Sequence, residues 1–173
     1  MTIWADADSL QGEIRDYLCR RVAHAPREGC ALVFVSARRI RIRLKDSARR
    51  IVVEEGPQAA DDRIASLSQS GDLAVTRDIP LAERLAEKGL VVLNDRGEVF
   101  TLENVRERRS LRDRALELRE AGIVPELERR RSWGGREFKA FADAFDREFT
   151  KILKLGDTVS RTGHASPGGG AAP

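Results

Sequence analysis

Continuous apolar runs constrain the fold of this chain more than any other feature. Residues 31–35 are Ala-Leu-Val-Phe-Val, residues 90–93 are Leu-Val-Val-Leu, and residues 3–5 near the start are Ile-Trp-Ala. Strands of a parallel sheet are buried on both faces, so they are apolar throughout instead of alternating with polar residues. Segments with helical spacing of apolar residues separate these runs. The pattern predicts an α/β fold with a central, mostly parallel sheet and helices on both of its faces.

The spacing of apolar residues also predicts where the helices lie and where the domain ends. A stripe of phenylalanines three and four residues apart between 138 and 149 predicts an amphipathic closing helix, with the stripe in the core or in an interface. Residues 1–153 are expected to form one domain, and the Gly-, Ser-, Ala- and Pro-rich residues 154–173 a disordered tail. The other helices are expected at 9–25, from Asp61 onward, from Pro80 to Lys88, and at 101–121.

The stretch from Gly71 to Asp78 combines a turn, a strand and an acidic residue in eight positions. Val75 and its neighbours are strand formers, and Pro80 suits the first turn of a following helix. Asp78 is therefore expected at the C-terminal end of a strand, where ligands bind in open α/β sheets. The alternative is that Asp78 only caps the next helix.

Two further acidic segments have similar positions. Asp6 and Asp8 follow the first apolar run, and Asp61 opens a helix. Carboxylates that converge in one pocket repel one another unless a cation lies among them. Hard oxygen ligands favour Mg²⁺ or Mn²⁺ over zinc, and the chain has only two histidines, neither of them near an acidic motif.

Composition sets the class of protein and leaves the partner open. The chain has 31 basic and 28 acidic residues, and it contains no apolar run long enough for a membrane span and no secretory signal. A cytoplasmic, soluble protein without a membrane partner is expected, with Cys19 and Cys30 reduced. The basic residues between 39 and 45 alternate with apolar ones, as in an edge strand or an extended loop. They indicate either a charged edge that resists strand pairing or a phosphate-binding strip. For the arginines of residues 101–121, a solvated helix face is expected.

The order of these motifs resembles the YaiI/YqxD family of uncharacterised bacterial proteins, the DUF188 type. The residues that carry the resemblance are 1–8, 60–61, 71–82 and 94–97, and it extends over roughly 1–153. That family is similar to a branch of the PIN-like nuclease superfamily. The resemblance implies a PIN-like three-layer α/β/α sandwich in which acidic residues hold Mg²⁺ or Mn²⁺ and cleave phosphodiester bonds, usually in RNA.

The resemblance also implies roles for individual residues. Asp6, Asp61 and Asp78 match the catalytic and metal-binding acids of PIN-like domains. Asp8 and Asp72 are acids of the narrower family's own motifs and complete the expected metal set. Two arginines, Arg41 and Arg112, stand where family members carry arginine and are expected to bind phosphate.

The chain departs from the family pattern in two places. Ser9, Leu10 and Gln11 replace the usual Ala-Cys-Pro that follows the Asp-x-Asp motif, and Ala37 replaces a usual asparagine. Neither change removes an acid.

Three functions are compatible with these residues. The first is a divalent-metal-dependent nuclease or phosphodiesterase that acts on RNA or another nucleic acid. The second is a phosphotransfer enzyme of the haloacid dehalogenase type, with Asp6 as nucleophile and Asp8 as acid-base, although Leu10 breaks that superfamily's opening motif. The third is a non-catalytic module that binds a metal or a nucleic acid. The sequence leaves the oligomeric state undetermined.

Overall fold

The computed structural model describes residues 1–25, 30–44, 48–53, 56, 58–122 and 133–162. A six-stranded sheet forms its centre, in the order β3-β2-β1-β4-β5-β6, and all strands are parallel except β6. The strands are β1 (Thr2–Asp6), β2 (Ala31–Ser36), β3 (Ala48–Val52), β4 (Leu73–Val75), β5 (Val91–Leu93) and β6 (Val99–Phe100). The helices are α1 (Gly12–Ala23), α2 (Ala59–Leu67), α3 (Ile79–Glu87), α4 (Leu102–Glu120) and α5 (Gly135–Thr162).

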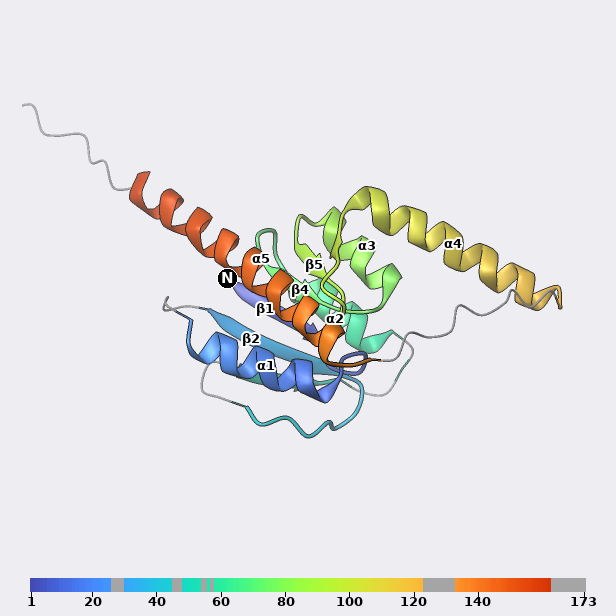
Figure 1. Cartoon of the computed structure of the whole chain (residues 1–173), viewed down its shortest axis with the longest axis horizontal. Coiled ribbons are helices and arrows are strands. Elements are labelled where there is room, and N and C mark those ends of the chain that lie inside the picture. The colour runs from blue at the N-terminus through green and yellow to red at the C-terminus, as the bar shows by residue number, and fades with distance from the viewer. Residues whose placement is uncertain (26–29, 45–47, 54–55, 57, 123–132, 163–173) are drawn as a thin grey trace, which may run out of the picture.

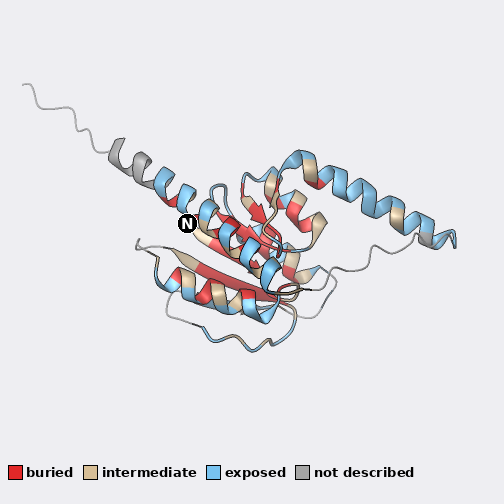
Figure 2. Cartoon of the chain, viewed as in Figure 1, coloured by how far each residue is buried: buried red, intermediate tan, exposed pale blue. Residues whose placement is uncertain are grey.

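Helices cover both faces of the sheet, as the apolar runs predicted (Figure 1). α1 and α5 pack against one face, α2 and α3 pack against the other, and α4 packs on α3. Side chains of the central strands alternate between two cores: Ile3 and Ala5 of β1 contact α1 and α5, whereas Trp4 contacts the opposite layer. Both faces of the central strands are buried (Figure 2). The fold is therefore a three-layer α/β/α sandwich.

The order of the strands reverses between β1 and β4. After β1 the chain adds β2 and then β3 on one side, and after β3 it returns to add β4, β5 and β6 on the other side. The helix that follows β1 lies on one face of the sheet, and the helix that follows β4 lies on the other. Diverging connections of this kind leave a crevice at the carboxyl ends of the two strands, the usual ligand position in open α/β sheets.

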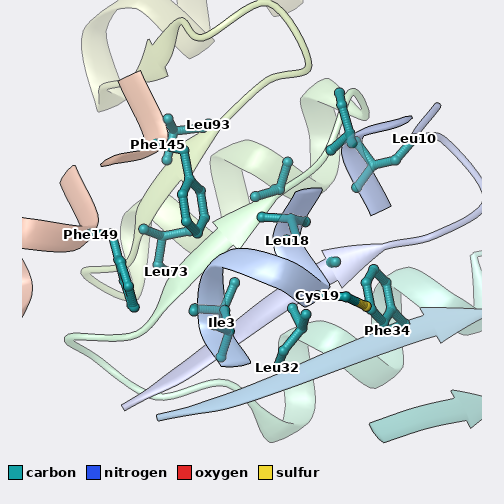
Figure 3. Packing of buried hydrophobic residues seen from close by; sticks show 14 of the residues in the cluster. Ile3, Leu10, Leu18, Cys19, Leu32, Phe34, Leu73, Leu93, Phe145 and Phe149 are labelled. Carbon is teal, nitrogen blue, oxygen red and sulfur yellow. The ribbon is translucent and has the colours of Figure 1, made fainter. Parts of the chain in front are cut away.

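The phenylalanine stripe of α5 belongs to the core. Phe141, Phe145 and Phe149 are completely buried. Tyr17 of α1 meets Phe141 and Phe145 edge-on, with ring centroids 5.9 Å apart in both pairs. Figure 3 shows Phe145 and Phe149 among the aliphatic side chains of this core. Of the two interpretations of the stripe, burial in the core is thus confirmed.

Residues 39–44 form a loop, which is one of the two structures that the sequence left open, and the edge strand is β3, which begins at Ala48. Other segments differ from the sequence prediction. The short antiparallel β6 was not predicted, since two residues carry too weak a pattern. α5 continues to Thr162, through the first residues of the segment expected to be a disordered tail. Neither Gly156 nor the polar residues after it end the helix. The rest of that tail, 163–173, lies outside the described residues. So do most of residues 127–133, for which the basic sequence predicts a linker.

Within the described part of the chain, no helix combines the length and the apolar character that crossing a membrane requires.

The burial of the α5 stripe leads to a prediction about stability. Phe145→Ala should lower the free energy of unfolding by about 3–5 kcal/mol, because it removes a buried ring and leaves a cavity. Leu155→Ala on the same helix is the control: Leu155 is 67% exposed, and its truncation should cost less than about 0.5 kcal/mol. Urea titration of both variants measures the difference, and equal losses would show that the stripe does not hold α5 on the sheet.

Candidate functional site

Asp6 is the last residue of β1 and is almost completely buried, with 4% of its surface exposed. Its Oδ2 accepts a hydrogen bond of 2.9 Å from Oγ1 of Thr76, which directly follows β4. Burial raises the pKa of the Asp6 carboxyl, and the hydrogen bonds from Thr76 and Ser9 oppose this effect. The carboxylate thus lies at the carboxyl ends of the two strands between which the sheet order reverses.

Asp78 follows β4 by three residues and has two local roles. It is the N-cap of α3, where its Oδ1 accepts a 2.8 Å hydrogen bond from the backbone N–H of Leu81. Its own N–H donates to Oγ1 of Thr76 at 3.0 Å, so Thr76 connects the Asp6 and Asp78 segments. Asp78 therefore lies just past the C-terminal end of β4, as the sequence predicts, and it also caps α3.

Asp61 belongs to a helix and not to the end of a strand, since it lies in the first turn of α2. The chain enters this helix through Gln58, a non-glycine residue with a φ of 65°. Partial burial, together with the negative charges of Asp78 and Asp6, raises the pKa of the Asp61 carboxyl to about 6. Because charges act over short distances in water, this effect means that the three acids are neighbours.

A pocket of about 440 Å³ brings these residues together. Four aspartates line it: Asp6, Asp8, Asp61 and Asp78. They come from the end of β1, the segment after it, α2 and the cap of α3. The first and the last of them, Asp6 and Asp78, are more than seventy positions apart in the sequence. The remaining lining residues are Ser9, Ala37, Gly56, Gln58, Ala59, Ala60 and Arg77.

Asp8 is fixed against the end of β2. Its Oδ2 accepts a 2.6 Å hydrogen bond from the N–H of Ala37, and its Oδ1 lies 3.4 Å from Nε of Arg38. Ser9 and Ala37, two positions where the sequence departs from the family pattern, both line the pocket. The departures therefore change the wall of the pocket and leave its acids in place.

Arg77 is the basic residue of the pocket, and the sequence analysis did not single it out. Its Nε lies 3.3 Å from Oδ2 of the buried Asp95, and its N–H donates to Oγ of Ser9 at 3.3 Å. Burial raises the pKa of the Asp95 carboxyl, which the charge of Arg77 opposes. The position of Arg77 between β4 and Asp78 could have identified it from the sequence, because every residue of that short connection lies at the same edge of the sheet.

Asp72, expected as a metal ligand, lies at the opposite edge of the sheet, and the structure does not bring it to the pocket. It precedes β4, whereas Asp78 follows it. Its carboxylate accepts hydrogen bonds from the N–H of Thr2 at 2.8 Å, from Nε1 of Trp4 at 3.0 Å and from the N–H of Gln69 at 3.0 Å. These bonds join the start of β1 to the turn before β4, which is a structural role.

The two arginines expected to bind phosphate do not line the acidic pocket. Arg41 is exposed in the loop after β2, where it borders a second hollow together with Asp16, Arg43 and Arg50. Arg112 is exposed on α4. Neither arginine is therefore positioned at the carboxylates.

The donor set of the pocket has the chemistry that a hard divalent cation requires, since all four acidic groups are carboxylates. Among the described residues, however, no three acidic, histidine or cysteine side chains are close enough together to hold one ion. Mg²⁺ is commonly bound by one or two carboxylates, with water and substrate phosphate as its other ligands. The residues thus fit an open Mg²⁺ or Mn²⁺ site and do not form a closed metal cage.

The hydrogen bonds of Asp72 lead to a prediction about stability. Asp72→Ala should lower the free energy of unfolding by about 2–4 kcal/mol, because it leaves one buried and two partly buried N–H donors without an acceptor. Asp113→Ala, which removes an exposed aspartate from α4, should cost less than about 1 kcal/mol. Urea titration compares the two, and a loss no greater than that of the control would contradict the structural role.

The pKa of Asp61 predicts how stability depends on pH. A carboxyl group whose pKa rises from 3.8 to about 6 binds more protons in the native than in the unfolded state between these values. The wild-type protein should therefore lose stability as pH rises through this window. Asp61→Asn removes that loss, so above the window the variant should be more stable by about 1 kcal/mol, a value that allows for solvent screening. Below about pH 4 the difference should vanish.

Asp62→Asn is the matched control for Asp61→Asn. Asp62 occupies the same helical turn but is exposed and pairs with Arg84 at 2.8 Å. Its replacement should leave the stability unchanged or lower it by less than about 1 kcal/mol. Urea titrations between about pH 4 and pH 8 measure both variants. If Asp61→Asn behaves like Asp62→Asn, the pKa of the Asp61 carboxyl is not raised in the folded protein.

Comparison with known proteins agrees with the arrangement of these motifs. The model of the family described as "Uncharacterized BCR, YaiI/YqxD family" matches residues 4–151. A UPF0178 protein of Treponema pallidum is 43% identical over 90% of this chain and 85% of its own length. A UPF0178 protein of Myxococcus xanthus is 41% identical over 89% of this chain and 97% of its own length. No solved structure matches the chain significantly. The chain therefore belongs to the YaiI/YqxD family.

Proposed function

We propose that this protein is a divalent-metal-dependent phosphodiesterase that acts on RNA or another nucleic acid, and that its sandwich is a PIN-like domain. The observation that carries the proposal is the convergence of Asp6, Asp8, Asp61 and Asp78 in one pocket at the point where the strand order reverses. Such crevices are the usual ligand sites of open α/β sheets, and clustered carboxylates are the usual protein ligands of Mg²⁺ in phosphoryl chemistry.

The charges of the pocket support a cation more than they support an empty pocket. The raised pKa of Asp61 reflects burial first and then repulsion by Asp78 and Asp6. A divalent cation beside these groups would relieve the repulsion and favour the ionised form of the Asp61 and Asp6 carboxyls. Asp6, Asp61 and Asp78 are therefore the carboxylates proposed to hold Mg²⁺ or Mn²⁺, one or two of them directly and the others through water, and Asp8 lies on the same wall.

Each residue would have a definite task in cleavage. When bound, the ion polarises a phosphoryl oxygen and lowers the pKa of a water ligand. Thr76 holds the Asp6 carboxylate in place through its 2.9 Å hydrogen bond, and the cap of α3 holds Asp78. Arg77 offers the pocket a positive charge to orient the phosphate, since a guanidinium matches the geometry of phosphate oxygens.

Cleavage of a labelled single-stranded RNA in millimolar Mn²⁺ tests the proposal. Asp6→Asn, Asp61→Asn and Asp78→Asn should each lower the rate by about a hundredfold or more, because each removes, at nearly constant shape, a negative charge that helps to hold the ion. Asparagine is also a good N-cap, so Asp78→Asn should keep α3 intact. Asp62→Asn should cleave at the wild-type rate, since Asp62 does not line the pocket.

Two other results would replace this function with an alternative. Asp6 and Asp8 both line the pocket, so a beryllium fluoride adduct on Asp6 would indicate phosphotransfer through an aspartyl-phosphate. Calorimetric binding of Mn²⁺ that depends on Asp6 and Asp61, without cleavage of any RNA tested, would indicate a non-catalytic module. Cleavage that persists in all three aspartate variants would contradict the proposed site itself.

A further inference from the structure

The loop between β2 and β3 carries the most concentrated positive charge of the chain. Between Arg38 and Arg50 the sequence has six arginines and one lysine but only one acidic residue. The arginines of the described loop are Arg38, Arg39, Arg41 and Arg43, and β3 adds Arg49 and Arg50. All six are exposed. We call these six residues the arginine strip.

The side chains of the loop alternate in direction. Ile40 and Ile42 are partly buried and pack against the core on the α1 side of the sheet. The intervening Arg39, Arg41 and Arg43 are exposed. Nη1 of Arg50 donates a 2.7 Å hydrogen bond to the carbonyl oxygen of Ile40, which ties the loop to β3. The isoleucines thus anchor the loop, and the arginines form one outward-facing row.

Ion pairs do not neutralise this row as they neutralise other arginines. On α4, Arg106, Arg108 and Arg109 all pair with glutamates. In the strip, among the residues that the structure describes, Arg38 alone makes an ion pair, with Asp8. Asp16 borders the same hollow as Arg41 and Arg43 but lies outside ion-pair distance of both. The strip therefore presents uncompensated positive charge to the solvent.

The course of the loop connects this charge to the acidic pocket. β2 ends at the same sheet edge as β1 and β4, and Ala37, the next residue, lines the pocket. From there the loop runs along the sheet to the opposite edge, since β3 starts at Ala48 and pairs there with Leu32 at the start of β2 (Figure 1). One end of the strip is thus the rim of the pocket.

We propose that the arginine strip binds the phosphate backbone of single-stranded RNA and leads the strand into the acidic pocket. The inference rests on the proposed function and names the surface that binds its substrate. Guanidinium groups bind phosphate in a bidentate manner, and alternate residues of a chain are at most about 7 Å apart, so successive arginines can contact successive phosphates. A single row fits one backbone better than the two backbones of a duplex.

RNA binding in EDTA tests the strip without any cleavage. Fluorescence anisotropy of a labelled single-stranded RNA would compare wild type, Arg41→Gln/Arg43→Gln and the charge-matched control Arg114→Gln/Arg136→Gln. The control arginines are exposed on α4 and α5, and neither borders the acidic pocket or the hollow of the strip. The strip variant should bind about tenfold more weakly, and the slope of log affinity against log salt should fall by about 1.4. The control should bind as wild type does.

Three results would overturn the inference. Equal losses of RNA affinity in the two variants would mean that the net charge of the protein attracts RNA diffusely. Failure of the wild type to bind RNA at low salt would mean that the strip is not an RNA-binding surface. Loss of binding to phosphatidylserine vesicles, with RNA binding unchanged, would assign the strip to a membrane. EDTA prevents metal-dependent cleavage, so binding and cleavage are measured separately. RNA that binds through the strip but is never cleaved in Mn²⁺ would refute the proposed phosphodiesterase, and the strip would remain an RNA-binding surface.

Discussion

The burial of β1 and β4 on both faces is the constraint on which the rest of this structure depends. Their side chains fill two separate cores, so helices must cover both sides of the sheet. The connections after these two strands lie on opposite faces, and the crevice between them is where Asp6 and Asp78 lie. The position of the acidic pocket is thus a consequence of how the apolar residues are buried.

The acidic pocket opposes the stability that these cores provide. Burial raises the pKa of Asp6, and burial together with neighbouring charge raises that of Asp61. Both shifts mean that the folded protein disfavours the ionised carboxylates. A fold selected for stability alone would place neutral residues here, and strain of this kind is typical of functional sites. Asp72 provides the contrast, since its hydrogen bonds stabilise the sheet at the opposite edge.

Opposite charges are divided between two adjoining surfaces. The carboxylates line the pocket, whereas the arginine strip begins at its rim and runs along the edge of the sheet. An acidic pocket alone would repel a polyanion. Positive charge beside the pocket would hold an RNA strand to the surface, and a cation within the pocket would let a phosphate of that strand enter. Asp8 lies between the two surfaces, because it lines the pocket and also pairs with Arg38.

The sequence by itself determined the α/β class and the order of the main strands and helices along the chain. It also identified Asp6, Asp61 and Asp78 as candidate site residues. Local patterns suffice for these features, because apolar runs and helical spacing reflect burial directly. It also predicted the position of Asp78 after a strand and its place as the cap of the next helix, since a strand and a proline-marked helix flank that residue.

The tertiary structure alone decided which side chains share a pocket. Asp72 and Asp78 belong to one sequence motif, yet the strand between them carries them to opposite edges of the sheet. The arrival of Asp61 beside Asp6 depends on the crossing from β3 to β4, which no local pattern specifies. Whether residues 39–44 form a strand or a loop was likewise a tertiary outcome, because alternation of apolar and charged residues fits any chain that packs one side against a core.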